Sequence, residues 1–143
     1  MTTDYDTWGL PCSLSGGSVY VLDASYDPLG RLDMMQSVEA DVDLVYYPFS
    51  TQGGRLHEIR AGMSSPYTQT QHLVYTYDNV GNVTSITDHR NAGQVQSFQY
   101  DELDRLTRAE ATGGADAYGP RDYVFNAVGN PLFFEGPSYQ SRI

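Results

Sequence analysis

The amino-acid sequence predicts an all-β protein of tandem antiparallel β-hairpins that form a curved sheet, and three observations lead to this fold class. The 143 residues include 12 Tyr, 14 Gly and 7 Pro but no lysine, a composition that favours strands and tight turns over helices. Aromatic residues two positions apart, such as Tyr75 and Tyr77, share one face of a strand. A short turn motif also recurs about every 20 to 30 residues.

The recurring motif is an aromatic residue followed by Asp-x-x-Gly and then Arg or Asn. Clear copies occupy residues 26–32, 77–83, 100–106 and 125–132, and weaker copies begin at residues 5 and 47. The six aromatic anchors are Tyr5, Tyr26, Tyr47, Tyr77, Tyr100 and Phe125. Because a repeat of this size forms one supersecondary unit that packs on the next, the sequence predicts a single repeat domain over residues 1–143.

Each copy of the motif predicts a hairpin turn. The Asp side chain can accept hydrogen bonds from backbone N–H groups two residues on, and the Gly supplies the positive φ that closes the hairpin. Asp104 stands at a Gly position and tolerates the left-handed conformation, while Asn126 can replace Asp as an acceptor. The predicted turn residues are Asp27, Gly30, Gly54, Asp78, Gly81, Asp101, Asp104, Asn126 and Gly129.

The third copy predicts a longer connection of a different kind. Pro48 follows the anchor Tyr47 and cannot make the turn bond of an Asp, and three extra residues precede Gly54. Two further stretches, residues 63–68 and 113–116, are polar or rich in Gly and Pro and indicate surface loops between units.

The charge and the apolar pattern exclude several classes of partner. A net charge of −10 has the wrong sign for a nucleic-acid-binding surface, so we expect no nucleic acid as a partner. No apolar run approaches the roughly 20 residues that cross a bilayer, so we expect no membrane insertion. Cys12 stands alone and predicts no disulfide framework. The first residues lack the features of a secretory signal, and we expect the chain to be a piece of a longer parent.

The sequence indicates no catalytic residue, no cofactor and no metal site, and hence no enzyme. His57, His72 and His89 lack metal-ligand spacing and are expected to be exposed on strands or loops. No Gly-x-Ser-x-Gly elbow is present. Asp41 and Asp43 share a strand face, for which a solvated surface is favoured over a weak cation site.

The recurring Tyr-Asp-x-x-Gly-Asn/Arg-Leu/Val unit closely resembles the YD repeat of the Rhs family, over about residues 5 to 135. In that family the repeats form a strip of antiparallel hairpins that spirals into a hollow shell, and in the bacterial toxins the shell encloses a cytotoxic domain. The resemblance implies one arc of such a shell, non-catalytic, which encloses or displays a toxin or effector domain. It implies a secreted or cell-surface parent, and neighbouring YD repeats as partners. Because a strip of hairpins has an unpaired strand at each end, we also expect other copies of the chain as partners.

Six aromatic side chains suggest an alternative from a different functional class. Their rings can form a cross-strand ladder between hairpins, or they can make an exposed platform that binds carbohydrate on a cell surface. These residues are Tyr75, Tyr77, Phe98, Tyr100, Tyr123 and Phe125. The ladder is the favoured interpretation, and glycans remain the alternative partner.

Overall fold

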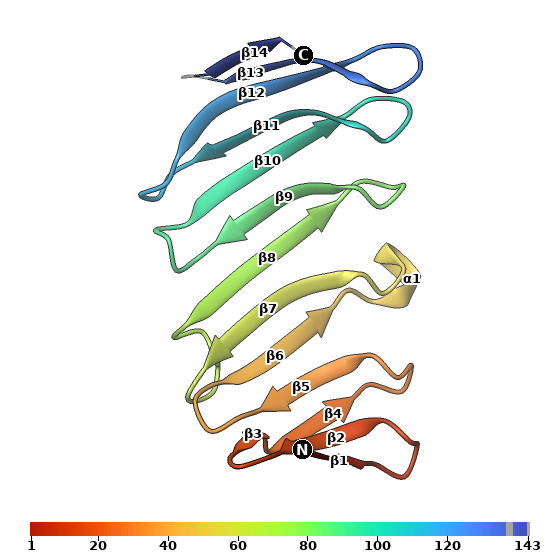
Figure 1. Cartoon of the computed structure of the whole chain (residues 1–143), viewed down its shortest axis with the longest axis vertical. Coiled ribbons are helices and arrows are strands. Elements are labelled where there is room, and N and C mark those ends of the chain that lie inside the picture. Colours follow the sequence, from red (N-terminus) through yellow and green to blue (C-terminus); the bar gives the residue numbers. More distant parts are fainter. Residues whose placement is uncertain (137–138, 143) are drawn as a thin grey trace. The chain divides into compact units, whose positions relative to one another are not determined.

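The computed structural model describes residues 1–136 and 139–142, which form β-strands and one four-residue helix (Figure 1). The chain divides into two compact units, Met1–Leu73 and Val74–Ile143. The only helix in the described part, α1 (Phe49–Gln52), lies in unit 1. No described helix is long and apolar enough to cross a membrane.

Unit 1 contains two antiparallel sheets. The first has the order β1-β2-β3, and the second contains β4, β5, β6 and β7 in chain order, each paired antiparallel to the next. The strands are β1 (Thr2–Tyr5), β2 (Pro11–Ser15), β3 (Val19–Val21), β4 (Asp23–Tyr26), β5 (Leu32–Gln36), β6 (Asp41–Tyr46) and β7 (Leu56–Gly62).

Unit 2 continues the same pattern. Strand β8 begins in unit 1 and ends in unit 2. Strands β8 to β14 follow one another in spatial order, and the neighbours from β9 to β14 pair antiparallel. These strands are β8 (Gln71–Tyr77), β9 (Val83–Asp88), β10 (Gln94–Tyr100), β11 (Leu106–Thr112), β12 (Tyr118–Phe125), β13 (Pro131–Gly136) and β14 (Tyr139–Arg142). The prediction of an all-β fold of tandem antiparallel hairpins is confirmed.

The hairpins share a register shift at the aromatic residue that ends their first strand. At this β-bulge the return strand has one extra residue, so the aromatic residue pairs with the first residue of the return strand. The pairs are Tyr5 with Pro11, Tyr26 with Leu32, Tyr46 with Leu56, Tyr100 with Leu106, and Phe125 with Pro131. The shared bulge shows that these five hairpins have one backbone plan.

The third aromatic anchor is Tyr46 in the structure, and not Tyr47 as the sequence spacing predicted. Tyr46 pairs with Leu56 at the bulge, and its hydroxyl donates to the carbonyl of Leu32 at 2.7 Å. Tyr47 occupies the place that Asp holds in the other turns, because its N–H donates to Arg55 O at 2.8 Å. Two adjacent tyrosines without a following Asp leave the sequence spacing undecided by one residue, and the strand register decides it.

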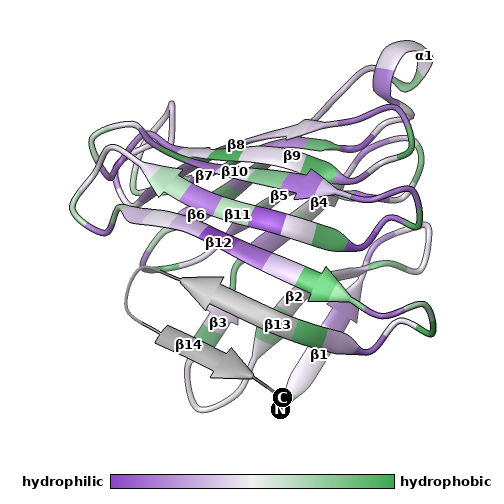
Figure 2. Ribbon diagram, turned by 90° about the horizontal axis from the view of Figure 1, so that it is seen from above, coloured by the Kyte–Doolittle hydropathy of each residue, from purple (hydrophilic) through white to green (hydrophobic). Residues whose placement is uncertain are grey.

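Few side chains are buried. In the described part they are Ala61, Ala109, Ala111 and Gln94, and most strand residues are half-buried. Figure 2 shows that most strands carry both hydrophilic and hydrophobic positions. The stability of such sheets comes from contacts between side chains of neighbouring strands more than from a deep core. The residues that join one hairpin to the next therefore contribute to stability.

Candidate functional site: the turn edge

The motif residues gather in the turns that join the two strands of each hairpin. We call these connections, at residues 6–10, 27–31, 47–55, 78–82, 101–105 and 126–130, turns 1 to 6, and together the turn edge. Turns 1 to 3 belong to unit 1 and turns 4 to 6 to unit 2. All of them follow the bulged or aromatic end of the first strand of a hairpin.

The first residue of each regular turn holds the turn closed with its side chain. Asp27 Oδ1 accepts hydrogen bonds from the N–H of Leu29 at 2.9 Å and of Arg31 at 3.0 Å. Gly30 has a φ of 77° and donates to the carbonyl of Asp27 at 2.9 Å. The side chain thus satisfies two backbone donors that the tight turn leaves unpaired.

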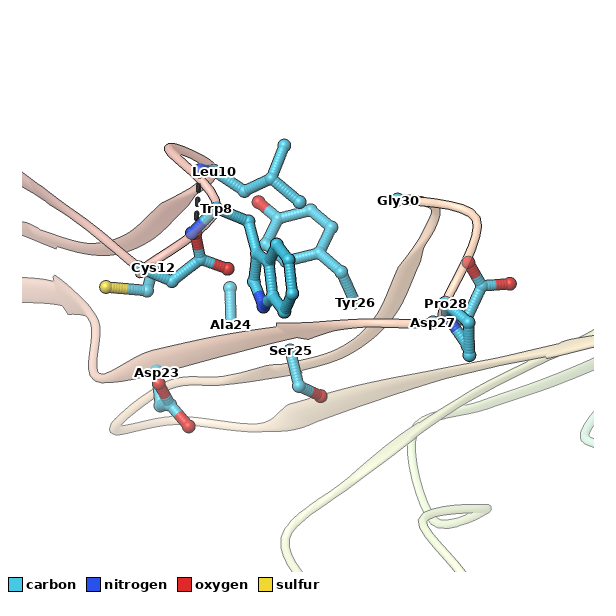
Figure 3. A pocket seen from close by; sticks show the side chains of 11 residues that line it. Trp8, Leu10, Cys12, Asp23, Ala24, Ser25, Tyr26, Asp27, Pro28 and Gly30 are labelled. Carbon is cyan, nitrogen blue, oxygen red and sulfur yellow. Dashed lines mark hydrogen bonds between the residues drawn. The ribbon is translucent and has the colours of Figure 1, made fainter.

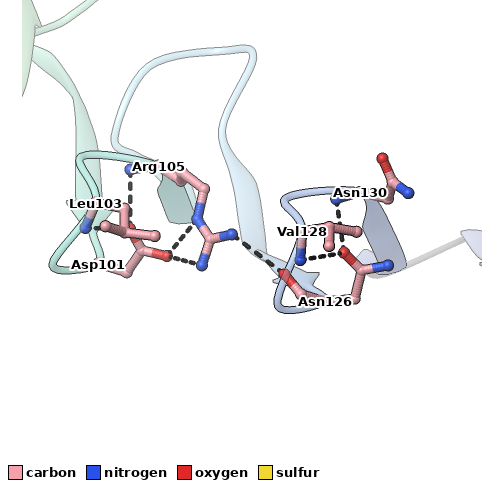
Figure 4. Close-up of polar contacts among 6 residues, drawn as sticks. All are labelled: Asp101, Leu103, Arg105, Asn126, Val128 and Asn130. Atoms are coloured by element: carbon pink, nitrogen blue, oxygen red, sulfur yellow. Dashed lines mark hydrogen bonds and ion pairs between the residues drawn. The ribbon is translucent and has the colours of Figure 1, made fainter.

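The same arrangement recurs in turns 4 to 6. Oδ1 of Asp78 accepts from three backbone N–H groups at 2.8 to 3.1 Å, and Oδ1 of Asp101 accepts from two at 2.9 and 3.0 Å. Asn126 takes the Asp position, with Oδ1 bonds of 3.1 and 2.9 Å (Figure 4). Gly81 and Gly129 have φ values of 112° and 88°, and Asp104 adopts 59° in their place.

Gly54 lies in turn 3 with a φ of 70°, after α1 rather than inside a four-residue turn. Pro48 precedes α1, and its carbonyl accepts from the N–H of Thr51 and Gln52. The long third connection expected from the sequence is therefore a single helical turn.

The turn carboxyls are held in their charged form. Partial desolvation raises the pKa of Asp27 and of Asp78, but hydrogen bonds from Arg31 and from the turn 4 backbone outweigh it, so both pKa values lie below the ordinary 3.8. At Asp101 the Arg105 guanidinium makes the largest contribution, and the pKa is again lowered. Donors aimed at a carboxylate stabilise its ionised form.

Acid should therefore loosen the turns. A carboxyl whose pKa is lower in the folded than in the unfolded chain contributes stability above its unfolded pKa, and that contribution is lost as the pH falls below it. We expect the thermal unfolding midpoint to be level between about pH 7 and 5 and to fall below about pH 4. Calorimetry across this range measures the effect.

A triple variant with Asp27→Asn, Asp78→Asn and Asp101→Asn provides the control, because Asn126 shows that the amide keeps the turn bonds. Its unfolding midpoint should depend less on pH than that of the parent. Equal pH profiles for the two proteins would contradict the role given to these carboxyls.

An arginine joins turn 2 to turn 3. The Arg31 guanidinium binds Oδ2 of Asp27, with Nε at 2.7 Å and Nη2 at 2.6 Å. Its Nη1 donates to the carbonyl of Gly54, and its Cζ lies 4.0 Å from the centroid of the Tyr46 ring. One side chain thus connects an acid in its own turn with an aromatic ring and a carbonyl of the next hairpin.

Arg105 repeats this arrangement between turns 5 and 6 (Figure 4). Its Nε and Nη2 bind Oδ2 of Asp101 at 2.7 and 2.6 Å, and its Nη1 donates to the carbonyl of Asn126 at 3.4 Å. Its Cζ lies 4.8 Å from the centroid of Phe125. Between turns 4 and 5 the shorter Asn82 does the same work, donating to Asp78 Oδ2 at 3.1 Å and to Asp104 Oδ1 at 2.8 Å.

Part of the turn-bearing region matches a known protein family. Residues 77–116, which contain turns 4 and 5, match the family model described as RHS Repeat. This segment carries an RHS repeat. The resemblance seen in the sequence is thereby confirmed, whereas no curated protein sequence matches the chain.

Solved structures share the fold of this chain. The chain resembles the structure "Crystal Structure of TcdB2-TccC3 without hypervariable C-terminal region" with a TM-score of 0.78 and 20% sequence identity. The alignment covers 98% of this chain and 8% of that one. The chain also resembles "Crystal Structure of TcdB2-TccC3" with a TM-score of 0.76 and 19% identity, over 98% and 9% of the two chains. This chain thus spans less than a tenth of each of these chains, and the likeness shows its fold.

A second set of side chains on the turn edge is apolar and open to solvent. The third residue of each regular turn is a large hydrophobic one whose N–H is held by the turn side chain. These residues are Trp8, Leu29, Val80, Leu103 and Val128, with exposed fractions of 85%, 64%, 70%, 69% and 81%. The recurring motif leaves these positions variable, although an apolar residue stands two places after the Asp or Asn in every regular turn.

The six aromatic residues considered for a carbohydrate platform are all half-buried. Tyr100 donates its hydroxyl to the carbonyl of Val83 at 2.9 Å, and burial raises its pKa. The Arg105 guanidinium lies over the ring of Phe125. The rings of Tyr100 and Phe125 thus contact neighbouring hairpins of unit 2, and a glycan platform stays a prediction.

Two of the three histidines differ from the expectation of exposed residues. His57 and His72 lie half-buried on β7 and β8, and His89 is exposed after β9. The His57 ring lies 4.1 Å from that of Tyr47, between centroids, and His72 Nε2 binds Glu58. Cross-strand partners bury them, a relation that sequence spacing does not reveal.

Asp41 and Asp43 are likewise half-buried rather than solvated. Oδ1 of Asp41 accepts from the Ser37 N–H at 3.2 Å, and Asp43 forms an ion pair with Arg60, its register partner on β7. Among the described residues there is no group of three or more His, Cys, Asp or Glu side chains that could hold a metal ion.

Proposed function

We propose that this chain is a non-catalytic wall segment of an Rhs/YD-repeat shell, which encloses or displays a toxin or effector domain of a secreted or cell-surface parent. The observation that carries the proposal is the set of bridges by which Arg31, Asn82 and Arg105 each join one turn to the next. The polar atoms of these three side chains form hydrogen bonds within their own turn and to the next turn, which is the role expected of residues that hold a wall together.

The similar structures support this role. They are structures of TcdB2-TccC3, one of them without a hypervariable C-terminal region, and this chain aligns with about a twelfth of such a chain. A segment that repeats one hairpin plan can be extended on either side by further hairpins, since each contacts only its neighbours. Neighbouring YD repeats of a longer chain are the partners that this plan accommodates.

Limited proteolysis tests the enclosing role. The reading frame is expressed with its flanking coding sequence, and the digestion of the domain that follows the repeats is timed in that parent and as a separate polypeptide. We expect strong protection in the parent, and faster digestion when Arg31→Gln and Arg105→Gln weaken the wall. Equal digestion rates for the enclosed and the separate domain would overturn an enclosing role.

The isolated chain should also associate with itself. The apolar tips of the turn edge are exposed, and β14 ends the strand order of its sheet, where an edge strand offers unpaired backbone groups. We expect an average mass above the 15.9 kDa monomer as concentration rises, despite the net charge of −10. Light scattering over a hundredfold concentration range measures this, and a strict monomer throughout would contradict it.

A further inference from the structure

Turn 1 lacks the side chain that joins turns elsewhere. Arg31 and Arg105 occupy the fifth position of turns 2 and 5, and the residue at that position in turn 1 is Leu10. The backbone equivalence is direct, because Asp6 N–H donates to Leu10 O at 2.8 Å as Asp27 N–H donates to Arg31 O at 2.9 Å. Leu10 has no donor to offer to turn 2.

The acid of turn 1 is nevertheless in place. Oδ1 of Asp6 accepts from the N–H of Trp8 and of Leu10, both at 2.8 Å, so the turn is closed in the usual way. The Oδ2 oxygen is the one that Arg31 and Arg105 bind in their own turns. In turn 1, no side chain among the described residues donates to it.

The aromatic half of the arrangement is in place as well. Tyr26 occupies the bulge position of Tyr46 and Phe125, and its hydroxyl donates to the Pro11 carbonyl at 2.7 Å, just as Tyr46 donates to Leu32. Guanidinium groups lie over the rings of Tyr46 and Phe125. Within the described part of the chain none lies over Tyr26.

A hollow occupies the place where that guanidinium would lie. It has a volume of about 840 Å³, and its wall includes Asp6, Trp8, Leu10, Tyr26 and Asp27 but no basic residue. Figure 3 shows the indole of Trp8 and the ring of Tyr26 on the same hollow. The Trp8 side chain adds a second aromatic wall that turns 2 and 5 do not have.

We propose that this hollow between turns 1 and 2 binds the guanidinium of an arginine side chain supplied by a partner polypeptide. Two arginines of the chain already occupy the equivalent places. The guanidinium groups of Arg31 and Arg105 each pair with a carboxylate of their own turn and lie over an aromatic ring of the next hairpin. An incoming arginine would find the free oxygen of Asp6, the face of Tyr26 and the indole of Trp8.

Arginine fits this place better than lysine. A planar guanidinium stacks on an aromatic ring while its in-plane N–H groups reach a carboxylate and a carbonyl together, whereas an ammonium is a compact, strongly hydrated charge. The protein's net charge of −10 also favours a cationic partner. Recognition should therefore depend on charge and on planarity.

Fluorescence of Trp8 reports on this place alone, because it is the only tryptophan of the chain. The probes are blocked tripeptides, acetyl-Gly-X-Gly-amide, with X as arginine, lysine or the neutral arginine isostere citrulline. We expect a saturable change with arginine, a weaker one with lysine and none with citrulline. A response to citrulline equal to that to arginine, or no saturable response to arginine, would overturn the proposal.

Three variants locate the binding. Asp6→Asn removes the charge but keeps the turn, as Asn126 does in turn 6, and should weaken binding about tenfold. Leu10→Arg places an internal guanidinium in the hollow and should abolish binding while raising the unfolding temperature. Glu102→Gln, an exposed charge removal in unit 2, should change nothing. Unaltered arginine binding by a folded Asp6→Asn or Leu10→Arg protein would overturn the assignment.

Discussion

Replacing Gly81 or Gly129 by valine should lower the free energy of unfolding by about 1–3 kcal/mol. Gly81 has a φ of 112° and Gly129 a φ of 88°, a region that a β-branched side chain does not adopt without strain. At Gly129 the strain is the main cost, since the nearest atom to an added Cβ is Arg105 Nη1 at 4.0 Å. The turn hydrogen bonds of Asp78 and Asn126 depend on this backbone geometry.

Chemical denaturation of the two variants measures the loss. The matched control is Gly17→Val, because Gly17 lies outside the left-handed region and an added Cβ meets no atom within 4 Å. We expect this control to unfold with the parent. If Gly81→Val and Gly129→Val are as stable as Gly17→Val, the turns tolerate a β-branched residue and the strain assigned to them is wrong.

The turns could be predicted from the sequence because their causes are local. An Asp that accepts from the N–H groups two and four residues on, and a Gly with positive φ, fall within one five-residue stretch, as in Asp27 to Arg31. The strand alternation that gave the fold class is equally local. No knowledge of which hairpins are neighbours is needed for either.

The contacts between hairpins could not be predicted in the same way. Arg31 reaches Gly54, 23 residues away, and Tyr100 reaches Val83, 17 residues away, so both depend on strand register. The third anchor was misplaced for this reason, since Tyr46 and Tyr47 differ only in which of them lies at the bulge. The vacant place beside Leu10 likewise becomes visible only when the occupied turns are compared in space.

Tyr46→Ala should cost more stability than the equivalent change Tyr26→Ala. Both tyrosines lie at a bulge and donate a hydroxyl hydrogen bond of 2.7 Å to the preceding hairpin. Only Tyr46 carries the Arg31 guanidinium, 4.0 Å from its ring centroid, and burial raises its pKa. We expect Tyr46→Ala to lower the free energy of unfolding by about 2–3 kcal/mol, which is less than the loss for a fully buried aromatic side chain because Tyr46 is half-buried.

The difference between the two positions isolates the arginine contact. A guanidinium over a partly exposed ring contributes about 0.5–1 kcal/mol, so Tyr26→Ala should be milder by about that amount. Tyr46→Phe keeps the ring and removes only the hydroxyl bond, so it should cost about 1 kcal/mol and leave the cation in place. Denaturant unfolding of all three variants gives the comparison. Equal losses at Tyr26 and Tyr46 would show that the Arg31 stacking adds nothing to the joint between turns 2 and 3, and the same stacking would then be a weak basis for arginine recognition at turn 1.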